Sequence, residues 1–192
     1  MLHKIQVWLN DLAVIANEKK RAAKADGQKY IWYSTQKNKD IKRKLSLEGE
    51  KLLSNGTRLS SRSSSGSSGR EWLYDFALRE FDENNHLIGI MLAVEIELSD
   101  SKPGGLVYDF NKLLQADAPY KVFILQQKDE VAFYEILGYL ETTLDTYKHR
   151  LDCKFLIGCW LTAKYEFIYK QYDVRPMPNQ GFKSFAALTG TG

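Results

Sequence analysis

The sequence has few of the features that mark secreted, metal-stapled or membrane-spanning proteins. It contains 2 cysteines and 3 histidines in 192 residues. Its longest apolar runs, residues 88–94 and 155–161, are far shorter than the ~20 residues that a membrane-spanning helix needs. Asn10 and Asp11 interrupt the first apolar stretch, which is therefore not typical of a signal peptide. We expect a cytoplasmic protein without a membrane partner.

The cysteines and histidines do not form a recognisable site. Cys153 and Cys159 are six residues apart in a predicted strand, which separates their Cα atoms by about 20 Å. A disulfide needs about 4.4–6.8 Å, so we expect two buried, reduced thiols. His3, His86 and His149 are isolated in the sequence. The chain also lacks a P-loop motif and any signature of a serine hydrolase.

The charge is nearly balanced overall but unevenly distributed. The 27 basic and 24 acidic residues give a net charge of +3, and 44% of the residues are hydrophobic, as in ordinary soluble domains. Ten basic residues but only two acidic ones lie between Lys19 and Lys44, with three aromatic residues among them. This run is either a solvated face or a surface that binds phosphates. The candidate nucleic-acid-binding residues, including three arginines farther along, are Lys19, Lys20, Arg21, Lys42, Arg43, Lys44, Arg58, Arg62 and Arg70.

The hydrophobic pattern predicts an α/β protein. Apolar residues recur at helical spacing over residues 2–24, and a second helix is predicted over 39–54. Residues 56–70 are rich in serine and glycine and predict a flexible loop, either a linker or a segment that orders on a polyanion. Further on, strands are predicted over 72–82, 87–99, 120–126, 154–162 and 165–172, and helices over 106–116 and 130–148. We thus expect a basic helical region over 1–55, an α/β core over 71–174 with a central mixed sheet flanked by helices, and a tail over 175–192.

Three carboxylates are predicted to converge on one strand pair. Residues 88–98 alternate, so that Glu95 and Glu97 project from one face about 6.5–7 Å apart. A hairpin turn centred near Asn85 places Asp75 directly opposite Glu95, with Cβ atoms about 4.5–5.5 Å apart. Like charges so placed repel, and Mg²⁺ or Mn²⁺ would relieve the repulsion. The alternative is that Glu95 and Glu97 line a solvated sheet face.

These residues resemble the motifs of the PD-(D/E)XK nuclease superfamily, to which many restriction endonucleases belong. Asp75 matches the first motif, and Glu95-Ile96-Glu97 matches the second with glutamate in place of the usual lysine. In some members the lysine has moved to the following helix, where this chain has Lys112. The likeness spans residues 39–127. The stretches REWLYDF, VEIEL and DFNKLLQA are also similar to those of uncharacterised bacterial proteins within the superfamily.

The resemblance implies a restriction-endonuclease-like core and a Mg²⁺-dependent enzyme that cuts DNA, as a homodimer by analogy with restriction enzymes. Asp75, Glu95 and Glu97 would hold the metal, and Lys112 would stabilise developing negative charge. Glu48, on the preceding helix, is a further candidate acid. The alternative hypothesis is a non-catalytic module on the same fold that binds nucleic acid or protein. Lys112 and Glu48 would then be ordinary surface residues.

Overall fold

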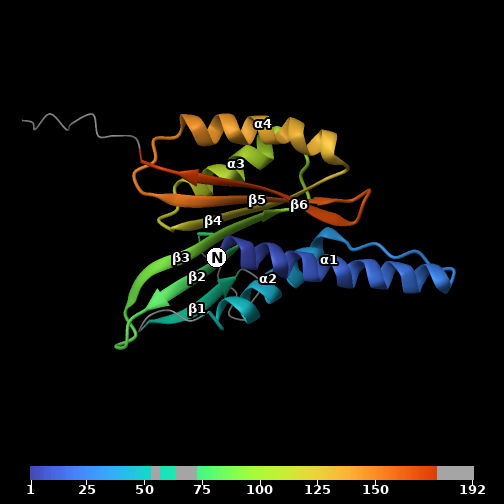
Figure 1. Ribbon diagram of the computed structural model, residues 1–192, viewed down its shortest axis with the longest axis horizontal. Helices are drawn as coiled ribbons and strands as arrows, with labels where there is room; N and C mark the ends of the chain where they lie inside the picture. The colour runs from blue at the N-terminus through green and yellow to red at the C-terminus, as the bar shows by residue number, and fades with distance from the viewer. Residues whose placement is uncertain (53–56, 64–72, 177–192) are drawn as a thin grey trace, which may run out of the picture.

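The computed structural model describes residues 1–52, 57–63 and 73–176, which form one mixed sheet flanked by helices (Figure 1). The sheet has six strands in the order β1-β2-β3-β4-β5-β6. The elements follow one another as α1 (Leu2–Ala25), α2 (Ser34–Gly49), β1 (Arg58–Ser63), β2 (Phe76–Phe81), β3 (Leu87–Glu97), α3 (Pro103–Leu114), β4 (Tyr120–Gln127), α4 (Glu130–Thr146), β5 (Cys153–Leu161) and β6 (Glu166–Val174).

The sheet combines antiparallel edges with a parallel centre. β1, β2 and β3 form an antiparallel meander, β3, β4 and β5 run parallel, and β6 pairs antiparallel with β5. The parallel connections require crossovers, and α3 and α4 supply them. β4 and β5 are buried along almost their whole length because helices cover both of their faces. This arrangement confirms the predicted α/β class with a mixed central sheet.

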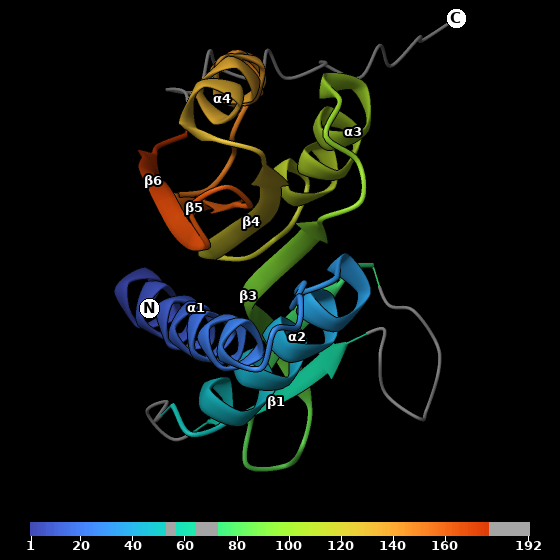
Figure 2. The ribbon, with the colours of Figure 1, turned by 90° about the vertical axis from the view of Figure 1, so that its right-hand side faces the viewer.

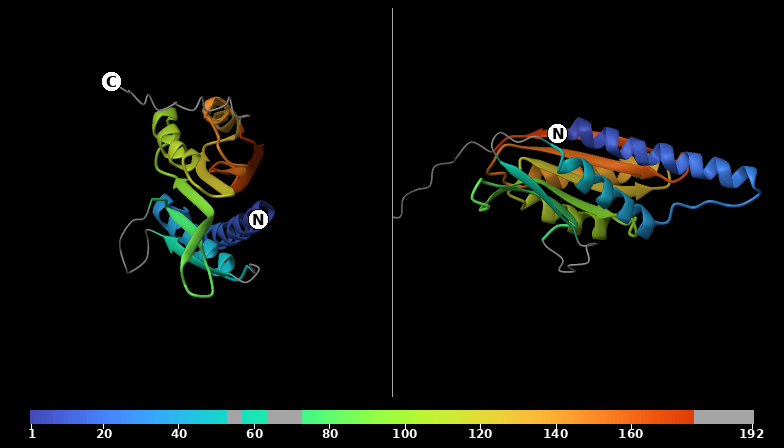
Figure 3. Two further views of the ribbon diagram at one scale, coloured as in Figure 1. Left: turned by 90° about the vertical axis from the view of Figure 1, so that its left-hand side faces the viewer. Right: turned by 90° about the horizontal axis from the view of Figure 1, so that it is seen from below.

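Two hydrophobic clusters lie on opposite faces of the sheet. One joins α1 and α2 to alternate strand residues such as Val94, Ile124 and Trp160. The other joins α3 and α4 to the strand residues that point to the opposite face, such as Ala93 and Phe123. Figures 2 and 3 show α1 and α2 on one side, with α3 and α4 over the part of the sheet that contains β4 and β5. The N-terminal helices are therefore part of the domain core and not an appendage to it.

The helices form where the apolar spacing and local signals favour them. α1 buries a stripe that includes Ile5 and Leu9 at helical spacing. α3 begins with Pro103, whose fixed φ suits the first helical turn. α4 begins after Asp129, whose side chain accepts a hydrogen bond from the Ala132 backbone N–H at 3.1 Å.

Part of the Ser/Gly-rich segment is a strand, contrary to the prediction of a flexible loop. Residues 58–63 form β1, which pairs along its whole length with β2. An edge strand of this kind is stabilised by backbone hydrogen bonds and one buried side chain, Leu59, so hydroxyl-rich residues do not prevent it. The remaining residues of that segment, except Thr57, lie outside the described residues, as does most of the predicted tail.

The alternation predicted over residues 88–98 is interrupted in β3. Register shifts between β2 and β3 follow Leu78 and Glu80, and Ile88 is 54% exposed. The alternation is regular only from Leu92 onward, where Leu92, Val94 and Ile96 join the α1 and α2 side of the core. The second helix also begins earlier than predicted, at Ser34 instead of residue 39.

Both cysteines are buried and reduced, as the sequence predicted. Among the described residues, no helix is both long and apolar enough to cross a membrane.

The packing of α1 against the sheet makes a direct prediction about stability. Ile5 is fully buried, whereas Ile15 on the same helix is 45% exposed. We expect Ile5→Ala to lower the free energy of unfolding by about 2–5 kcal/mol, because it leaves a cavity in the core. Ile15→Ala is the matched control and should cost less than about 1 kcal/mol, measured by urea denaturation. Equal losses for the two variants would contradict the placement of α1.

Candidate functional site

The meander brings Asp75 and Glu95 together at the end of β3. Phe76 pairs with Val94, and the same register persists through Ala77 and Leu78. These pairs match the register expected from a turn centred near Asn85, which adopts a left-handed φ of 66° in the structure. Extending the register by one residue beyond β2 places Asp75 opposite Glu95.

Glu95 is a buried carboxylate that binds a lysine. It is 1% exposed and lies on the central part of the sheet, where its backbone pairs with Phe123 of β4. Its Oε2 lies 2.9 Å from the Nζ of Lys112 on α3. Lys112 also lies 3.0 Å from Asp109, one turn earlier on the same helix. The structure thus brings the lysine expected on this helix directly to the second-motif glutamate.

Burial dominates the electrostatics of this pair. Burial raises the pKa of Glu95 to about 7, against the hydrogen bond from Lys112, while the charge of Asp75 raises it further. Burial disfavours the charge on Lys112, but its hydrogen bonds to Glu95 and Asp109 together raise the pKa of its ammonium group. Lys112 therefore stays protonated at neutral pH, while Glu95 titrates there.

One oxygen of Glu95 has no hydrogen-bond partner in the described part of the chain. Its Oε1 is buried and accepts no hydrogen bond from any described residue. A buried carboxylate oxygen left in this state is costly, and such groups call for a specific explanation. A cation that binds there would satisfy it.

Asp75 is held by groups on two other elements. Its Oδ1 lies 2.7 Å from the Nζ of Lys42 on α2, a lysine that is 5% exposed. Its Oδ2 accepts a hydrogen bond from the Ile96 backbone N–H at 3.0 Å. These contacts fix the Asp75 carboxylate next to β3 and place one buried positive charge, that of Lys42, beside the acids.

Glu97 has a different environment from Glu95. Its Oε1 accepts hydrogen bonds from the backbone N–H and hydroxyl of Ser99, both at 2.6 Å, and from the Asp100 N–H at 2.8 Å. The carboxylate therefore fixes the turn between β3 and α3. Glu97 lines the same pocket as Glu95, but the structure does not combine it with Asp75 and Glu95 into one metal cluster.

The acids open onto a pocket of about 340 Å³ between α2, the end of β3 and α3. Asp75, Glu95, Asp109 and Lys112 line it, together with polar residues from the start of α2, Ser34, Thr35 and Asn38. Within the described parts of the chain, no three acidic, histidine or cysteine side chains form a metal cage. Asp75 and Glu95 nevertheless suit Mg²⁺, which is commonly held by one or two carboxylates, with waters and substrate phosphates as its other ligands.

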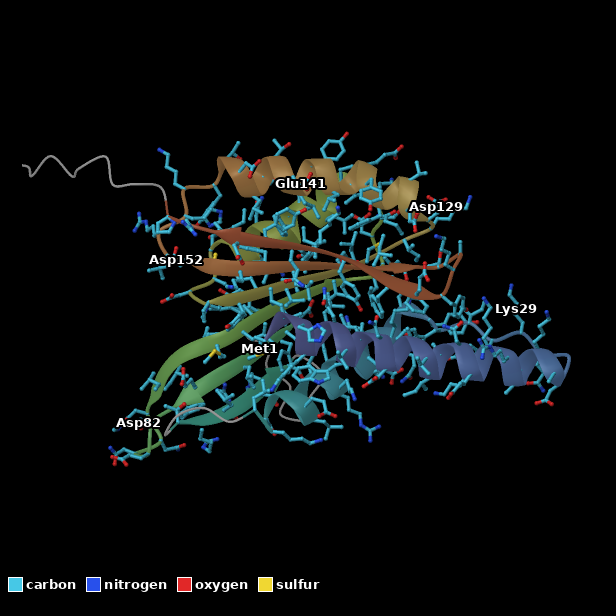
Figure 4. The ribbon with its side chains drawn as sticks, viewed as in Figure 1. Met1, Lys29, Asp82, Asp129, Glu141 and Asp152 are labelled. Carbon is cyan, nitrogen blue, oxygen red and sulfur yellow. The ribbon has the colours of Figure 1, made fainter. Side chains whose placement is uncertain are left out.

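The basic run does not form one continuous surface. Lys19, Lys20 and Arg21 are exposed near the end of α1, where Lys20 lies over the ring of Tyr165 at 3.6 Å. Figure 4 places Lys29, just beyond this helix, at the opposite end of the molecule from Asp82 in the β2–β3 turn. The far end of α1 is thus separated from the meander.

The other predicted basic residues are distributed over several environments. Lys42 belongs to the acidic site, and Lys44 forms ion pairs with Asp11 and Glu48 at 3.1 and 3.2 Å. Glu48 therefore pairs with lysines outside the site. Arg43 and Arg58 are exposed and Arg62 is half-buried, whereas Arg70 lies outside the described residues.

Two lysines of α2 have roles that sequence patterns did not indicate. Lys42 neutralises Asp75, and Lys37 is 1% exposed, with its Nζ 2.7 Å from the Oε1 of Gln126. Burial lowers the pKa of Lys37 to about 8, against the influence of Cys159. Their burial could have been inferred from their spacing. Lys37 is one turn before Ile41 and Lys42 directly follows it, so both lie near the apolar side of the helix that Ile41 and Leu45 form.

Comparisons of this chain with protein-family models, with curated proteins and with solved structures gave no match. The site is therefore interpreted from its own geometry.

The buried carboxylate predicts a pH-dependent stability. Because the pKa of Glu95 is raised on folding, the folded protein binds more protons than the unfolded chain between about pH 4.5 and 7. The folded state is therefore destabilised by the ionised Glu95 fully above about pH 7 and not at all below about pH 4.5. We expect Glu95→Gln to gain about 1–3 kcal/mol over the wild type at pH 8 without metal, and to lose this advantage near pH 4.5.

Urea denaturation at several pH values measures this difference. Glu135→Gln, which alters an exposed carboxylate on α4, is the control and should match the wild type throughout. A Glu95→Gln effect that is the same at pH 4.5 and pH 8 would contradict the raised pKa.

Proposed function

We propose that this protein is a metal-dependent nuclease that hydrolyses phosphodiester bonds in DNA on a restriction-endonuclease-like core. The sequence motifs motivate the reaction, and the geometry of the site supports it. The order of elements is also in line with this core, since the helix α2, the meander β1–β3, the helix α3 and the strand β4 follow one another. Asp75 directly precedes β2 and Glu95 lies on the adjoining strand β3, in line with the spacing of the motifs.

The observation that carries the proposal is the environment of Glu95. A carboxylate with 1% exposure has one oxygen on Lys112 and another without a partner among the described residues. A purely structural carboxylate would have both oxygens satisfied. This one lies beside a second acid and opens onto a pocket, which suits a divalent cation and a phosphate.

Each residue of the site has a distinct role in the proposed reaction. Asp75 and Glu95 would hold Mg²⁺, which when bound polarises a phosphoryl oxygen and lowers the pKa of a coordinated water. Lys112, protonated and oriented by Glu95 and Asp109, would stabilise the negative charge that develops on the phosphate. Glu97 would position the turn that precedes α3, and Lys42 would orient Asp75.

One observation favours a second candidate, a non-catalytic module that binds nucleic acid. Both oxygens of Asp75 already have partners, Lys42 and the Ile96 N–H. The two lysines of the site could balance the acids without any metal. This candidate predicts DNA binding that survives the loss of both acids and no stabilisation by divalent cations.

Stabilisation by metal distinguishes these candidates. We expect saturating Mn²⁺ or Mg²⁺ to raise the melting temperature at pH 8, because a ligand that binds only the folded state stabilises it. Glu95→Gln should abolish the shift, while Glu135→Gln should retain it. The metal affinity should weaken below about pH 7, because protons compete for Glu95. A wild-type melting temperature that does not respond to either metal would contradict the metal site.

Cleavage of supercoiled plasmid DNA in Mg²⁺ or Mn²⁺ tests the activity itself. Glu95→Ala should abolish cleavage, and Lys112→Met should slow it by about 10²–10³-fold, the usual effect of removing one donor to the transition state. Lys148→Met, at an exposed lysine after α4, should cleave at the wild-type rate. Equal cleavage by the wild type and Glu95→Ala, or none with either metal, would overturn the proposed reaction.

A further inference from the structure

Three arginines lie close together on the outer strands of the meander, on the sheet face away from α2. Arg58 and Arg62 alternate with Leu59, which is buried on the α2 side. On β2, Phe76 and Leu78 belong to that same side of the core, whereas Ala77 faces the other side. Arg79 is two residues after Ala77 and points to the same face of the sheet, because side chains alternate along a strand. It therefore shares this face with Arg58 and Arg62.

The strand register makes these arginines neighbours. Arg79 pairs with Ser60, so that Arg58 and Arg62, two residues away on either side, are its diagonal neighbours on β1. The guanidinium groups of Arg58 and Arg79 lie 4.7 and 5.2 Å from the centre of the Phe81 ring. Burial lowers the pKa of Arg79, and the positive charges of Arg62 and Arg58 lower it further. We name these three residues the arginine face.

The arginine face continues into the candidate site. The same side of β3 carries Ala93 and then Glu95, while β2 leads from Arg79 back toward Asp75. Arg79 lies four residue steps along the chain from Asp75, about 13 Å, which is the axial length of about four base pairs. Between the arginine face and the site, the described parts of β2 and β3 carry no acidic side chain on this face. Residues 87–94 contain no acid, and Glu80 points to the opposite face of the sheet because it is adjacent to Arg79 in the strand.

The outer edge of this face is exposed at Arg58, whereas Arg62 and Arg79 are half-buried and Ala77 on β2 packs into the cluster of α3 and α4. α2 packs on these two strands from the other side. In Figures 1 and 2, α3 and α4 lie over the other half of the sheet. A face that gathers positive charges against their mutual repulsion, next to a phosphodiester-cleaving site, is complementary to a polyanion.

We propose that the arginine face binds the phosphate backbone of duplex DNA and directs it into the pocket of Asp75 and Glu95. This inference rests on the proposed nuclease function and assigns the surface that holds the substrate. The guanidinium groups would contact phosphates on one side of the cut, so the contribution to affinity is electrostatic and independent of sequence. Arg79 is a contact that the sequence motifs did not suggest.

Salt-dependent DNA binding in EDTA tests the surface separately from cleavage. The probe is a fluorescein-labelled 30-base-pair duplex, titrated with full-length protein at several salt concentrations. For the variant Arg58→Gln/Arg62→Gln/Arg79→Gln, we expect the slope of log K against log[salt] to fall by about 2–3 in magnitude, since each phosphate contact contributes about 0.9. Affinity at low salt should fall at least tenfold.

Two further variants control for charge and for folding. Lys148→Gln/Arg150→Gln/Lys154→Gln removes three exposed basic residues near the start of β5 and should keep the wild-type slope. Arg58→Lys/Arg62→Lys/Arg79→Lys keeps the charge and should retain most of the slope, with an unchanged melting temperature. A wild-type slope in the glutamine variant, or an equal loss in the distant control, would overturn the proposal.

The outcomes also separate this inference from the proposed function. Arginine-dependent binding by a protein that fails to cleave DNA would uphold the surface and reject the nuclease. Cleavage that depends on Glu95 but is accompanied by arginine-independent binding would reject the surface and uphold the nuclease.

Discussion

The candidate site is built around a carboxylate that is buried at the end of β3. Glu95 lies on the ladder that joins the antiparallel meander to the parallel strands, and α3 closes over it with Lys112. Taking such a group out of water is unfavourable unless it is paired and hydrogen-bonded. Lys112 satisfies one oxygen, and Asp109 in turn holds Lys112. The remaining oxygen, Oε1, has no hydrogen-bond partner among the described residues. The proposed metal site follows from this observation.

The N-terminal helices are as much a part of this site as the sheet. α2 contributes Lys42 to Asp75 and the polar wall of Ser34, Thr35 and Asn38 to the pocket. The same helix buries Lys37 beside the indole rings of Trp32 and Trp160, with its Nζ 5.4 and 5.1 Å from their centres. Two lysines of the strongly basic region, Lys37 and Lys42, are therefore buried inside the domain. Neutralising internal acids and the proposed binding of external phosphates are distinct uses of positive charge, and they fall on different faces of the sheet.

Much of the fold could be predicted from the sequence, because periodicity and turn residues report local structure directly. The hairpin register that opposes Asp75 to Glu95 follows from the turn at Asn85, and the place of Lys112 follows from the helix after the second motif. β1 could not be predicted, since a hydroxyl-rich edge strand has almost no apolar pattern. Lys42 could not be assigned to the site either, because whether a lysine is exposed or buried depends on which elements pack beside it. Glu97 shares its face with Glu95, as predicted, but the turn captures its carboxylate.

Metal binding by the Glu95 Oε1, which has no partner among the described residues, can be observed directly. An anomalous difference map from crystals grown with Mn²⁺ should show a peak about 2.0–2.2 Å from the Glu95 Oε1, with Asp75 in the same coordination sphere. The peak should be absent from crystals of Glu95→Gln grown in the same way. A map without a peak at Glu95 in the wild type, at saturating Mn²⁺ and pH 8, would contradict the central claim.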